Sequence, residues 1–329
     1  MENGHTVSIT GVGSFLPRKV LTNDDLTKML DTTDEWIIKR TGIKERRVVE
    51  NGATASDLAI EASLRALDDA NVLPSEVGLI IAATITPDCL VPSTACFIQE
   101  KIGAKNAGAF DVLAACSGFV YALSIAKSFI VSGAMKTVLI VGTECLSKIT
   151  DYTDRSTCIL FGDGAGAAVV QRDNGKKKIV TTYLGSDGSQ ADLLKLPAGG
   201  SKLPVSQATI ESRSHYIQLR GKELFKTAIN NMVDMITKAA TENNMQVEDF
   251  DMIIPHQSNI RIIEAAMERL KQPKKKAYVN IDRYGNTSAA SIPIAIDEID
   301  KEGLLSPGDS VLLVAFGGGL TWGTSLIKW

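Results

Sequence analysis

The two halves of the chain repeat one pattern of apolar strands and helices. An apolar run around Ile80 precedes a loop and a helix-like segment, and a similar run around Ile253 does the same in the second half. The next strand-to-helix junction lies 36 positions after Ile80, at Cys116, and 33 positions after Ile253, at Asn286. A repeat this long is typical of a duplicated domain and not of a solenoid. The spacing predicts that Cys116 and Asn286 are structural counterparts.

The same pattern gives the fold class. Apolar, β-branched runs alternate with segments whose apolar residues recur at helical spacing, which predicts an α/β fold with sheets covered on both faces. The expected helices include 93–102, 224–239 and 260–270. The stretch 173–178 is typical of a linker, and the polar stretch 186–214 is typical of a loop inserted into the second half. We therefore predict two units, 1–173 and 174–329.

Composition describes an ordinary globular protein. The chain has 329 residues and a formal net charge of −3, and 22% of its residues are charged, so we expect no binding of nucleic acid. The first residues lack a charged region followed by an apolar one, and no run of about eighteen apolar residues occurs. We therefore expect a cytoplasmic protein with no membrane segment. Five cysteines without CxxC spacing indicate free thiols, and neither a disulfide scaffold nor a zinc site.

One of these thiols occupies a position suited to catalysis. Residues 109–123 are typical of a buried strand that runs into a helix, with Cys116 in the first turn of that helix. The thiolate is the reactive form of cysteine, and the N–H groups and dipole at a helix start lower the pKa of a thiol. Cysteine is also a common buried residue with no chemical role. Cys116 is thus a candidate nucleophile, with a packing residue as the alternative.

Two further residues could share a pocket with this thiol. Of the three histidines, His5 and His215 lie in terminal or polar segments, whereas His256 follows an apolar run, and strand ends are where open α/β sheets place ligands. Asn286 lies at its own strand-to-helix junction. The alternatives are a histidine that binds a backbone carbonyl and an asparagine that caps a helix. Two junctions related by a pseudo-twofold axis can nevertheless face one pocket between the halves.

Two other segments could bind parts of a ligand. The glycine run 317–319 follows an apolar strand and forms either a tight turn or an oxyanion hole, in which backbone N–H groups approach a thioester oxygen. No GxGxxG follows a first strand, so a dinucleotide site is not expected. Trp36 and Arg40 share a helix face and could stack an adenine and hold phosphate, although an ordinary amphipathic helix also fits. Arg155 is equally ambiguous.

Six segments in order carry a family resemblance. They are TDEWI (33–37), AACSGF (114–119), FGDGAGAA (161–168), PHQ (255–257), YGNTSAAS (284–291) and FGGGLTWG (316–323). Through them, and over about residues 7–329, the chain resembles β-ketoacyl-acyl-carrier-protein synthase III, the initiating condensing enzyme of bacterial fatty acid synthesis, in the thiolase-like superfamily. The resemblance implies a duplicated, five-layered αβαβα fold with two mixed sheets, and a homodimer.

The resemblance also implies roles for the reacting residues. Cys116 matches the acylated nucleophile, and His256 and Asn286 match the pair that promotes decarboxylation. The backbone N–H groups of Cys116 and Gly318 match the oxyanion hole. The implied reaction transfers an acyl group from acyl-CoA to the thiol, and then condenses it with malonyl-acyl carrier protein. Such a reaction needs no metal and no redox cofactor.

Binding positions follow from the same resemblance. Those matching the coenzyme A site are Thr32, Trp36, Arg40 and Arg155. Lys226 and Arg261 match a basic surface that docks the acidic carrier protein, but Glu268 stands where the family has another matching position. Val91 stands where many members have a phenylalanine contributed across the dimer to the acyl pocket. The smaller side chain leads us to expect starters larger than acetyl, such as branched or medium chains.

Other activities remain alternatives from sequence alone. A related condensing enzyme of a specialised pathway, which primes a secondary metabolite, a quinolone or a biotin precursor, would share the fold. A degradative thiolase is disfavoured, because it needs a second cysteine and none occurs after Cys158. A thioester hydrolase of the Cys/His/Asn type would use the same three residue types on an unrelated fold. A non-catalytic partner subunit typically lacks the reactive cysteine, which this chain retains.

Overall fold

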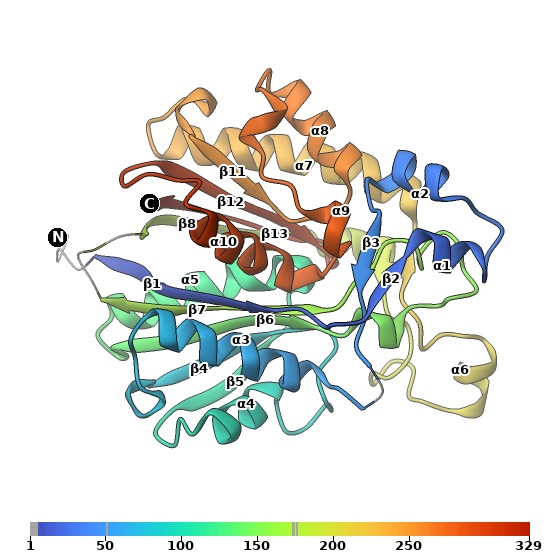
Figure 1. Cartoon of the computed structure of the whole chain (residues 1–329), viewed down its shortest axis with the longest axis horizontal. Helices are drawn as coiled ribbons and strands as arrows, with labels where there is room; N and C mark the ends of the chain where they lie inside the picture. Colours follow the sequence, from blue (N-terminus) through green and yellow to red (C-terminus); the bar gives the residue numbers. More distant parts are fainter. Residues whose placement is uncertain (1–5, 51, 173–174, 176) are drawn as a thin grey trace.

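Two similar halves make up the protein, whose computed structural model describes residues 6–50, 52–172, 175 and 177–329. Strands form the centre of each half, and helices lie outside and between them (Figure 1). The predicted boundary at residue 173 lies outside the described residues, as does His5. Within the described residues, no helix combines the length and the apolar character needed to cross a membrane.

Nine strands of the described chain form one mixed sheet. The first half contributes β1 (Val7–Phe15), β4 (Leu79–Ala83), β5 (Gly108–Val112), β6 (Thr137–Glu144) and β7 (Gly164–Arg172). The second half contributes β8 (Lys178–Ser186), β11 (Met252–Pro255), β12 (Ser310–Gly317) and β13 (Thr321–Lys328). The strand order is β11-β12-β13-β8-β1-β7-β6-β4-β5, and β1 pairs with β8 at Ser8 and Lys178. The two predicted mixed sheets are therefore present as two layers, joined through this pairing.

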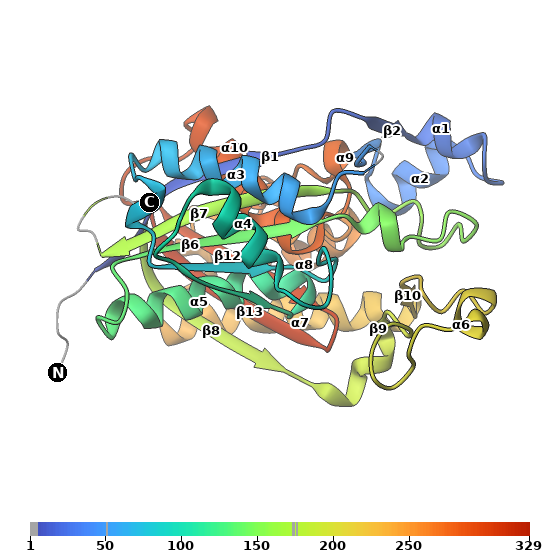
Figure 2. The ribbon, with the colours of Figure 1, turned by 90° about the horizontal axis from the view of Figure 1, so that it is seen from below.

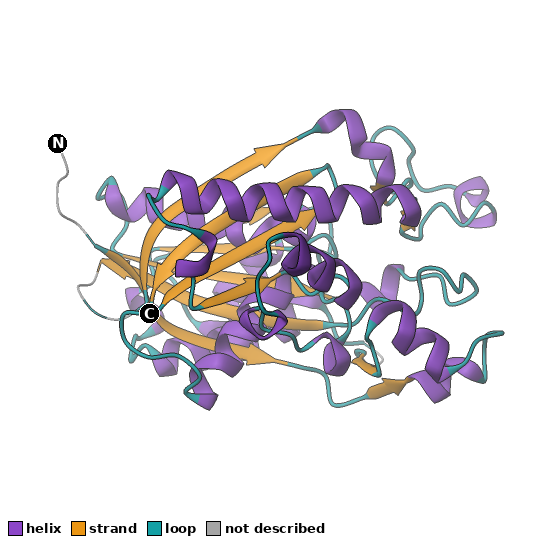
Figure 3. Ribbon diagram, turned by 90° about the horizontal axis from the view of Figure 1, so that it is seen from above, coloured by secondary structure: helices purple, strands orange, loops and turns teal. Residues whose placement is uncertain are grey.

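Helices complete a five-layered arrangement. The outer helices are α3 (Ala55–Asp69) and α4 (Thr94–Ile102) on the first half, and α7 (Gly221–Glu242) and α8 (Ile260–Arg269) on the second. The middle layer consists of α5 (Gly118–Val131) and α10 (Ser291–Glu302). One buried cluster joins Phe119 and Ile296 from these two helices to Ile140 and Leu313 from the strands on either side. Figure 3, viewed onto the second half, shows its helices in front of its strands. The predicted αβαβα fold is confirmed.

Local sequence signals set the ends of the helices. The predicted helices over 93–102 and 260–270 are α4 and α8, and the helix predicted over 224–239 extends at both ends as α7. Thr33 caps α2 (Asp34–Thr41) by accepting a hydrogen bond from the Trp36 N–H at 3.1 Å. Gly42 ends this helix with a φ of 82°, a conformation that glycine adopts without a steric penalty.

Short elements gather at one end of the molecule, where Figures 1 and 2 place α1, α2 and α6. They are β2 (Val20–Thr22), α1 (Asn23–Thr27), β3 (Glu45–Arg47), β9 (Leu194–Lys195), α6 (Gln207–Glu211), β10 (Gln218–Leu219) and α9 (Ile281–Tyr284). The predicted insertion over 186–214 contains β9 and α6, and β9 pairs with β10 just beyond it. An ion pair between Arg213 and Asp151 ties this insertion to the first half.

The internal repeat keeps a constant offset through its central strands. Leu79 pairs with Val138 in the first half, and Met252 pairs with Val311 in the second. Each residue of the second pair lies 173 positions after its equivalent in the first. Ile80 and Ile253, which the sequence pattern placed in equivalent positions, have the same offset. The carboxyl ends of β6 and β12, at Glu144 and Gly317, are therefore equivalent positions.

This offset corrects the predicted pairing of the two junctions. The 3₁₀ turns η2 (Ala115–Ser117) and η7 (Ser288–Ala290) precede α5 and α10, and their first residues have φ values of 46° and 48°. The repeat thus aligns Cys116 with Ala289, and the prediction that Asn286 is its counterpart was wrong. Cys116 lies 36 positions after Ile80, and Ala289 lies 36 positions after Ile253. Asn286 lies three residues before Ala289.

Candidate active site

A cavity of about 1080 Å³ lies between the two halves, at the ends of their central strands. The predicted site residues that line it are Trp36, Arg40, Cys116, Arg261, Asn286 and Gly318. Apolar side chains such as Leu194 and Ile217, from the insertion and the segment that follows it, form another part of its wall. The turns η2 and η7 contact each other, and each contacts the central strand of the opposite half. One cavity therefore receives groups from both halves.

Cys116 lies at this cavity with its side chain almost buried. It is the middle residue of η2, so it precedes α5 instead of lying in the first turn of the helix. Burial raises the pKa of the thiol to about 12; the Ser288 hydroxyl opposes this shift, and the charge of Glu144 adds to it. The direction is opposite to the shift that a helix start favours, because desolvation of the thiolate outweighs the nearby donors.

His256 directly follows β11, and the cavity lining includes Ser258 and Asn259, two and three residues farther along the chain, but not His256 itself. Its backbone N–H donates to the Val314 carbonyl at 2.8 Å, and its Nδ1 contacts the Ser291 Oγ at 2.7 Å. The side chain is 2% exposed, and burial lowers the pKa of the imidazole to about 3. His256 is therefore neutral at physiological pH, with Nδ1 engaged by the first residue of α10.

Asn286 is fixed by its backbone and its side-chain oxygen. Its N–H donates to the Leu160 carbonyl at 2.8 Å, and its own carbonyl accepts from the Gly162 N–H at 3.0 Å. Its Oδ1 accepts from the Ser288 N–H at 2.8 Å. Because Oδ1 is occupied, the Nδ2 group is the part of this amide that can donate to a ligand in the cavity.

The glycine turn after β12 lies directly against the loop that holds Cys116. A Cβ built on Gly317 would lie 2.7 Å from the Cys116 backbone nitrogen, so only glycine fits there without a shift of one of the two segments. Thr321 ties the two together, because its Oγ1 lies 3.0 Å from the Ala114 carbonyl oxygen and 3.1 Å from the Gly318 carbonyl oxygen, and its one hydrogen can be donated to either. The backbone of Gly318 is thereby held close to that of Cys116.

The aromatic residue predicted to bind adenine lies close to two guanidinium groups. Trp36 is 37% exposed on α2, and the Cζ atoms of Arg155 and Arg40 lie 5.0 Å and 5.9 Å from its ring centroid. Arg155 also donates to the Asp31 carbonyl at 2.7 Å. Thr32 has a buried Oγ1 with no hydrogen-bond partner among the described residues. These residues lie together near the mouth of the cavity, which Trp36 and Arg40 help to line.

The remaining predicted residues lie on the surface. Lys226 is exposed on α7 and Arg261 on α8, where the Arg261 guanidinium lies 5.3 Å from the Phe225 ring centroid. Glu268 is exposed farther along α8. Val91 is 84% exposed, and it is not among the residues that line this cavity within the described chain.

Sequence reasoning missed a buried carboxylate beside Cys116. Glu144, at the end of β6, is 0% exposed and accepts hydrogen bonds from the hydroxyls of Thr86 at 2.7 Å and Thr84 at 3.2 Å. Burial raises its pKa to about 7, and the Thr86 and Ser288 hydroxyls oppose that shift. The available signal was an acidic residue that ends the apolar run 137–144, directly after the buried part of a strand.

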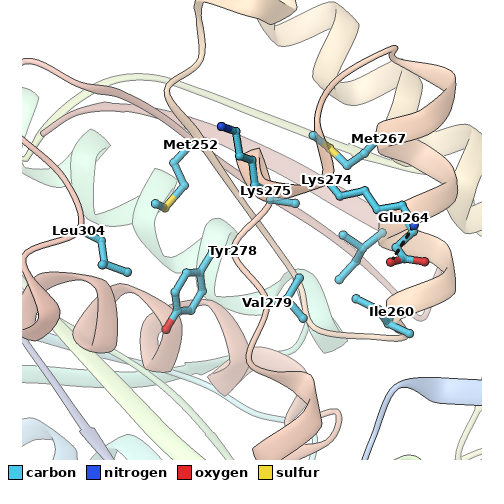
Figure 4. A pocket seen from close by; sticks show the side chains of 11 residues that line it. Met252, Ile260, Glu264, Met267, Lys274, Lys275, Tyr278, Val279 and Leu304 are labelled. Atoms are coloured by element: carbon cyan, nitrogen blue, oxygen red, sulfur yellow. Dashed lines mark ion pairs between the residues drawn. The ribbon is translucent and has the colours of Figure 1, made fainter. Parts of the chain in front are cut away.

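A second, smaller cavity of about 540 Å³ lies on the outer edge of the second half (Figure 4). Met252, Met267 and Tyr278 line it, and the ion pair between Lys274 and Glu264, at 2.9 Å, lies at one side. None of the residues predicted to react lines it, among those that the structure describes. The cavity between the halves is therefore the candidate active site.

Comparison with known proteins agrees with this geometry. Residues 110–188 match the family model of 3-oxoacyl-[acyl-carrier-protein] synthase III, and residues 240–329 match the model of its C-terminal part. The chain is 53% identical over 321 residues to a β-ketoacyl-[acyl-carrier-protein] synthase III of Caldanaerobacter subterraneus, covering 98% of this chain and 97% of the relative. It is 52% identical, over 98% of both chains, to a synthase III of Clostridioides difficile.

Solved structures give the same answer for the fold. The 3-oxoacyl-[acyl-carrier-protein] synthase III of Aquifex aeolicus superimposes with a TM-score of 0.90 and 48% sequence identity. The superposition covers 98% of this chain and all of that one. The duplicated α/β architecture, the cavity between its halves and this level of identity lead to one conclusion: the chain belongs to the 3-oxoacyl-[acyl-carrier-protein] synthase III family.

Proposed function

We propose that this protein catalyses the decarboxylative condensation of an acyl-CoA starter with malonyl-acyl carrier protein, which initiates fatty acid synthesis. The observation that carries the proposal is the convergence of Cys116, Asn286 and Gly318 on one cavity between the halves. A thiol, an amide donor and an accessible backbone are the groups that a two-stage transfer between thioesters needs. The reaction uses no metal and no redox cofactor.

The first stage transfers the acyl group to Cys116. The sulfur attacks the thioester carbonyl, and the N–H groups of Cys116 and Gly318 stabilise the negative charge that develops on the oxygen. The carbon–sulfur bond to coenzyme A then breaks, which leaves an acyl-enzyme and free coenzyme A. Thr321, whose Oγ1 lies 3.1 Å from the Gly318 carbonyl oxygen, supports this function by holding the turn in place.

The second stage forms the new carbon–carbon bond. Loss of carbon dioxide from the malonyl group leaves an enolate, whose oxygen accepts hydrogen bonds from His256 Nε2 and Asn286 Nδ2. The α-carbon of the enolate attacks the acyl carbonyl on Cys116, and the bond from that carbonyl to the cysteine sulfur breaks, which releases the β-ketoacyl product and returns the thiolate. The contact of 2.7 Å between Ser291 Oγ and His256 Nδ1 lets the hydroxyl donate to Nδ1, which leaves the imidazole hydrogen on Nε2. A neutral histidine fits this role, because it donates without offering a proton to the carbanion.

Substrate binding and assembly complete the proposal. Trp36, stacked with Arg155, holds the adenine of coenzyme A, and Arg40 and Thr32 lie beside it. The exposed cations Lys226 and Arg261 dock the acidic carrier protein near the cavity mouth. We also propose a cytoplasmic homodimer, in which the exposed Val91 of each protomer reaches the acyl pocket of its partner.

The small side chain of Val91 leads to a proposal on the starter. A valine leaves more room than the phenylalanine of many family members, so branched or medium-chain acyl-CoAs are preferred to acetyl-CoA. Comparing kcat/KM across a panel of acyl-CoAs tests this, with Val91→Phe as the variant that narrows the pocket. Turnover of acetyl-CoA that equals or exceeds that of every longer starter would contradict the proposal.

One experiment tests the reaction as a whole. The protein is incubated with each acyl-CoA, the added mass is located by peptide mapping, and malonyl-acyl carrier protein is then added. We expect acylation at Cys116, none in Cys116→Ala, and a β-ketoacyl product in the second step. Acylation followed only by free acid would favour the Cys/His/Asn hydrolase, and condensation restricted to an unusual starter would favour a specialised pathway.

A further inference from the structure

Glu144 is a buried carboxylate that the two-stage reaction does not use. It lies at the end of β6, which is central to the first half, and its side chain is 0% exposed. Its Oε2 accepts hydrogen bonds from Thr86 Oγ1 at 2.7 Å, Thr84 Oγ1 at 3.2 Å and the Ile85 N–H at 3.2 Å. Thr86 and Ile85 also line the cavity, so this carboxylate is held directly behind the cavity wall.

Ser288 lies in a turn that packs against both this carboxylate's strand and the turn of Cys116. Its side chain is 2% exposed, it lines the cavity, and its Oγ has no well-formed hydrogen bond among the described residues. The turn η7, which begins at Ser288, contacts both η2, which holds Cys116, and β6, which ends at Glu144. In keeping with this geometry, the Ser288 hydroxyl lowers the pKa of Cys116 and that of Glu144. A buried hydroxyl without a hydrogen-bond partner destabilises the folded protein, so its presence calls for an explanation, such as a catalytic role.

The backbone at Ser288 is strained in a way that fixes this position. Its φ of 48° lies in the left-handed region, which is unfavourable for a residue other than glycine. The adjacent hydrogen bond from the Ser288 N–H to Asn286 Oδ1, at 2.8 Å, holds the residue in that conformation. Strain of this kind persists where the surrounding structure demands it, and such positions cluster at functional sites.

The neighbouring groups leave Glu144 as the available base. His256 is neutral and its Nδ1 is occupied by Ser291, so the imidazole is a weak proton acceptor here. The titratable groups that face Glu144 are Cys116 on η2 and Cys145, the next residue in the chain, and burial keeps both thiols neutral by raising their pKa. The β4 side contributes Thr84 and Thr86, which carry no charge.

We propose that Ser288 and Glu144 form a proton relay that deprotonates Cys116 during acylation. As the sulfur of Cys116 bonds to the thioester carbon, its S–H bond breaks and the proton passes to Ser288 Oγ. The Ser288 hydroxyl gives its own proton to the Glu144 carboxylate. When the tetrahedral intermediate collapses, the bond to coenzyme A breaks, and the relay runs in reverse to protonate the departing thiolate. Ser288 is thus a catalytic residue, and Glu144 acts through it.

This inference rests on the proposed function, and the test separates the two stages. Single-turnover acylation by acyl-CoA is followed by intact mass from pH 5.5 to 9, and condensation is measured separately on enzyme that has been acylated by long incubation. We expect Glu144→Gln and Ser288→Ala to acylate about 10² to 10⁴ times more slowly, the usual contribution of a positioned base. The pre-acylated variants condense within about twofold of the wild-type rate.

The pH profile distinguishes a relay from a structural role. Wild-type acylation rises with pH and levels off as Glu144 ionises near pH 7, and Glu144→Gln loses this step, whereas Glu144→Asp keeps it. Electrostatics alone predict the opposite result: because the charge of Glu144 raises the pKa of Cys116, its removal would speed the formation of thiolate. Faster acylation by Glu144→Gln would therefore overturn the relay.

Matched controls use buried groups away from the cavity. Ser63 on α3 also has a buried Oγ without a partner among the described residues, and Asp297 on α10 is a buried carboxylate that accepts from Ser14. Ser63→Ala and Asp297→Asn should acylate at the wild-type rate. Wild-type rates in both relay variants, or an equal loss in both stages, would refute the relay. Absence of any acylation in the wild-type protein would refute the proposed function instead.

Discussion

Replacing Gly317 by alanine tests whether the glycine turn sets the position of Cys116, the proposed nucleophile. The added Cβ would lie 2.7 Å from the Cys116 nitrogen, 3.1 Å from the Ser117 nitrogen and 3.2 Å from the Ala114 carbonyl oxygen. The closest of these distances falls about 0.7 Å short of the 3.4 Å at which ordinary contact begins. All three atoms belong to the backbone, so no side chain can rotate away, and the loop itself must move.

The expected cost follows from that displacement. Overpacking of this kind destabilises a protein by about 1–3 kcal/mol, which leaves a 329-residue protein folded. A misplacement of about 1 Å at a reacting atom costs about 10²-fold in rate, so a shift of about 0.7 Å should slow acylation of Cys116 by roughly 10- to 100-fold. The loss should fall on the acylation rate constant and leave the affinity for acyl-CoA almost unchanged.

Single-turnover acylation and thermal melting measure the two effects. Gly188→Ala serves as the control, because a Cβ there meets no atom within 4 Å, and it should behave as wild type in both assays. The reasoning fails if Gly317→Ala is folded and acylates within twofold of the wild-type rate. It also fails if the variant loses affinity for acyl-CoA while its acylation rate constant is unchanged.

Three further predictions concern the adenine site, the buried histidine and the carrier surface. Trp36→Ala should raise KM for acyl-CoA by about 5- to 150-fold at little cost in kcat, because base stacking contributes about 1–3 kcal/mol; an equal loss in kcat would contradict an adenine site. His256 stays neutral in the folded protein while the unfolded chain takes up a proton below about pH 6.5, so wild-type stability falls with decreasing pH. Between pH 7.5 and 5, urea unfolding should show that the free energy of unfolding falls by about 2 kcal/mol less in His256→Gln than in the wild type. An equal fall in the two proteins would refute a lowered pKa of His256. Lys226→Glu should raise KM for malonyl-acyl carrier protein about tenfold at low salt, less at high salt, and leave KM for malonyl-CoA unchanged; an equal rise for both substrates would exclude a docking role.

The sequence pattern was sufficient for the fold because the repeat is long and its strands are buried. Runs such as 79–83 and 252–255 have no polar positions, so they identify central strands in both halves. The order of the segments, and the resemblance that they carry, then predicted the five layers. The two-sheet description needed one refinement, the pairing of β1 with β8, because a contact at Ser8 leaves no trace in periodicity.

The details of the site depend on contacts that spacing does not encode. The sequence pattern paired Cys116 with Asn286, whereas backbone geometry pairs it with Ala289. A helix start predicts a lowered thiol pKa, but the balance is decided by burial among residues from both halves. Glu144 was missed because its partners, Thr86 and Ser288, come from loops far apart in the chain.

The constant offset between the halves means that one backbone framework holds two different sets of side chains. Glu144 and Gly317 end equivalent strands, and Cys116 and Ala289 occupy equivalent turns. The equivalent positions therefore differ in side chain and not in backbone. The first half has a thiol and a carboxylate where the second has a methyl group and a glycine, and the missing side chain of Gly317 leaves room for the Cys116 loop.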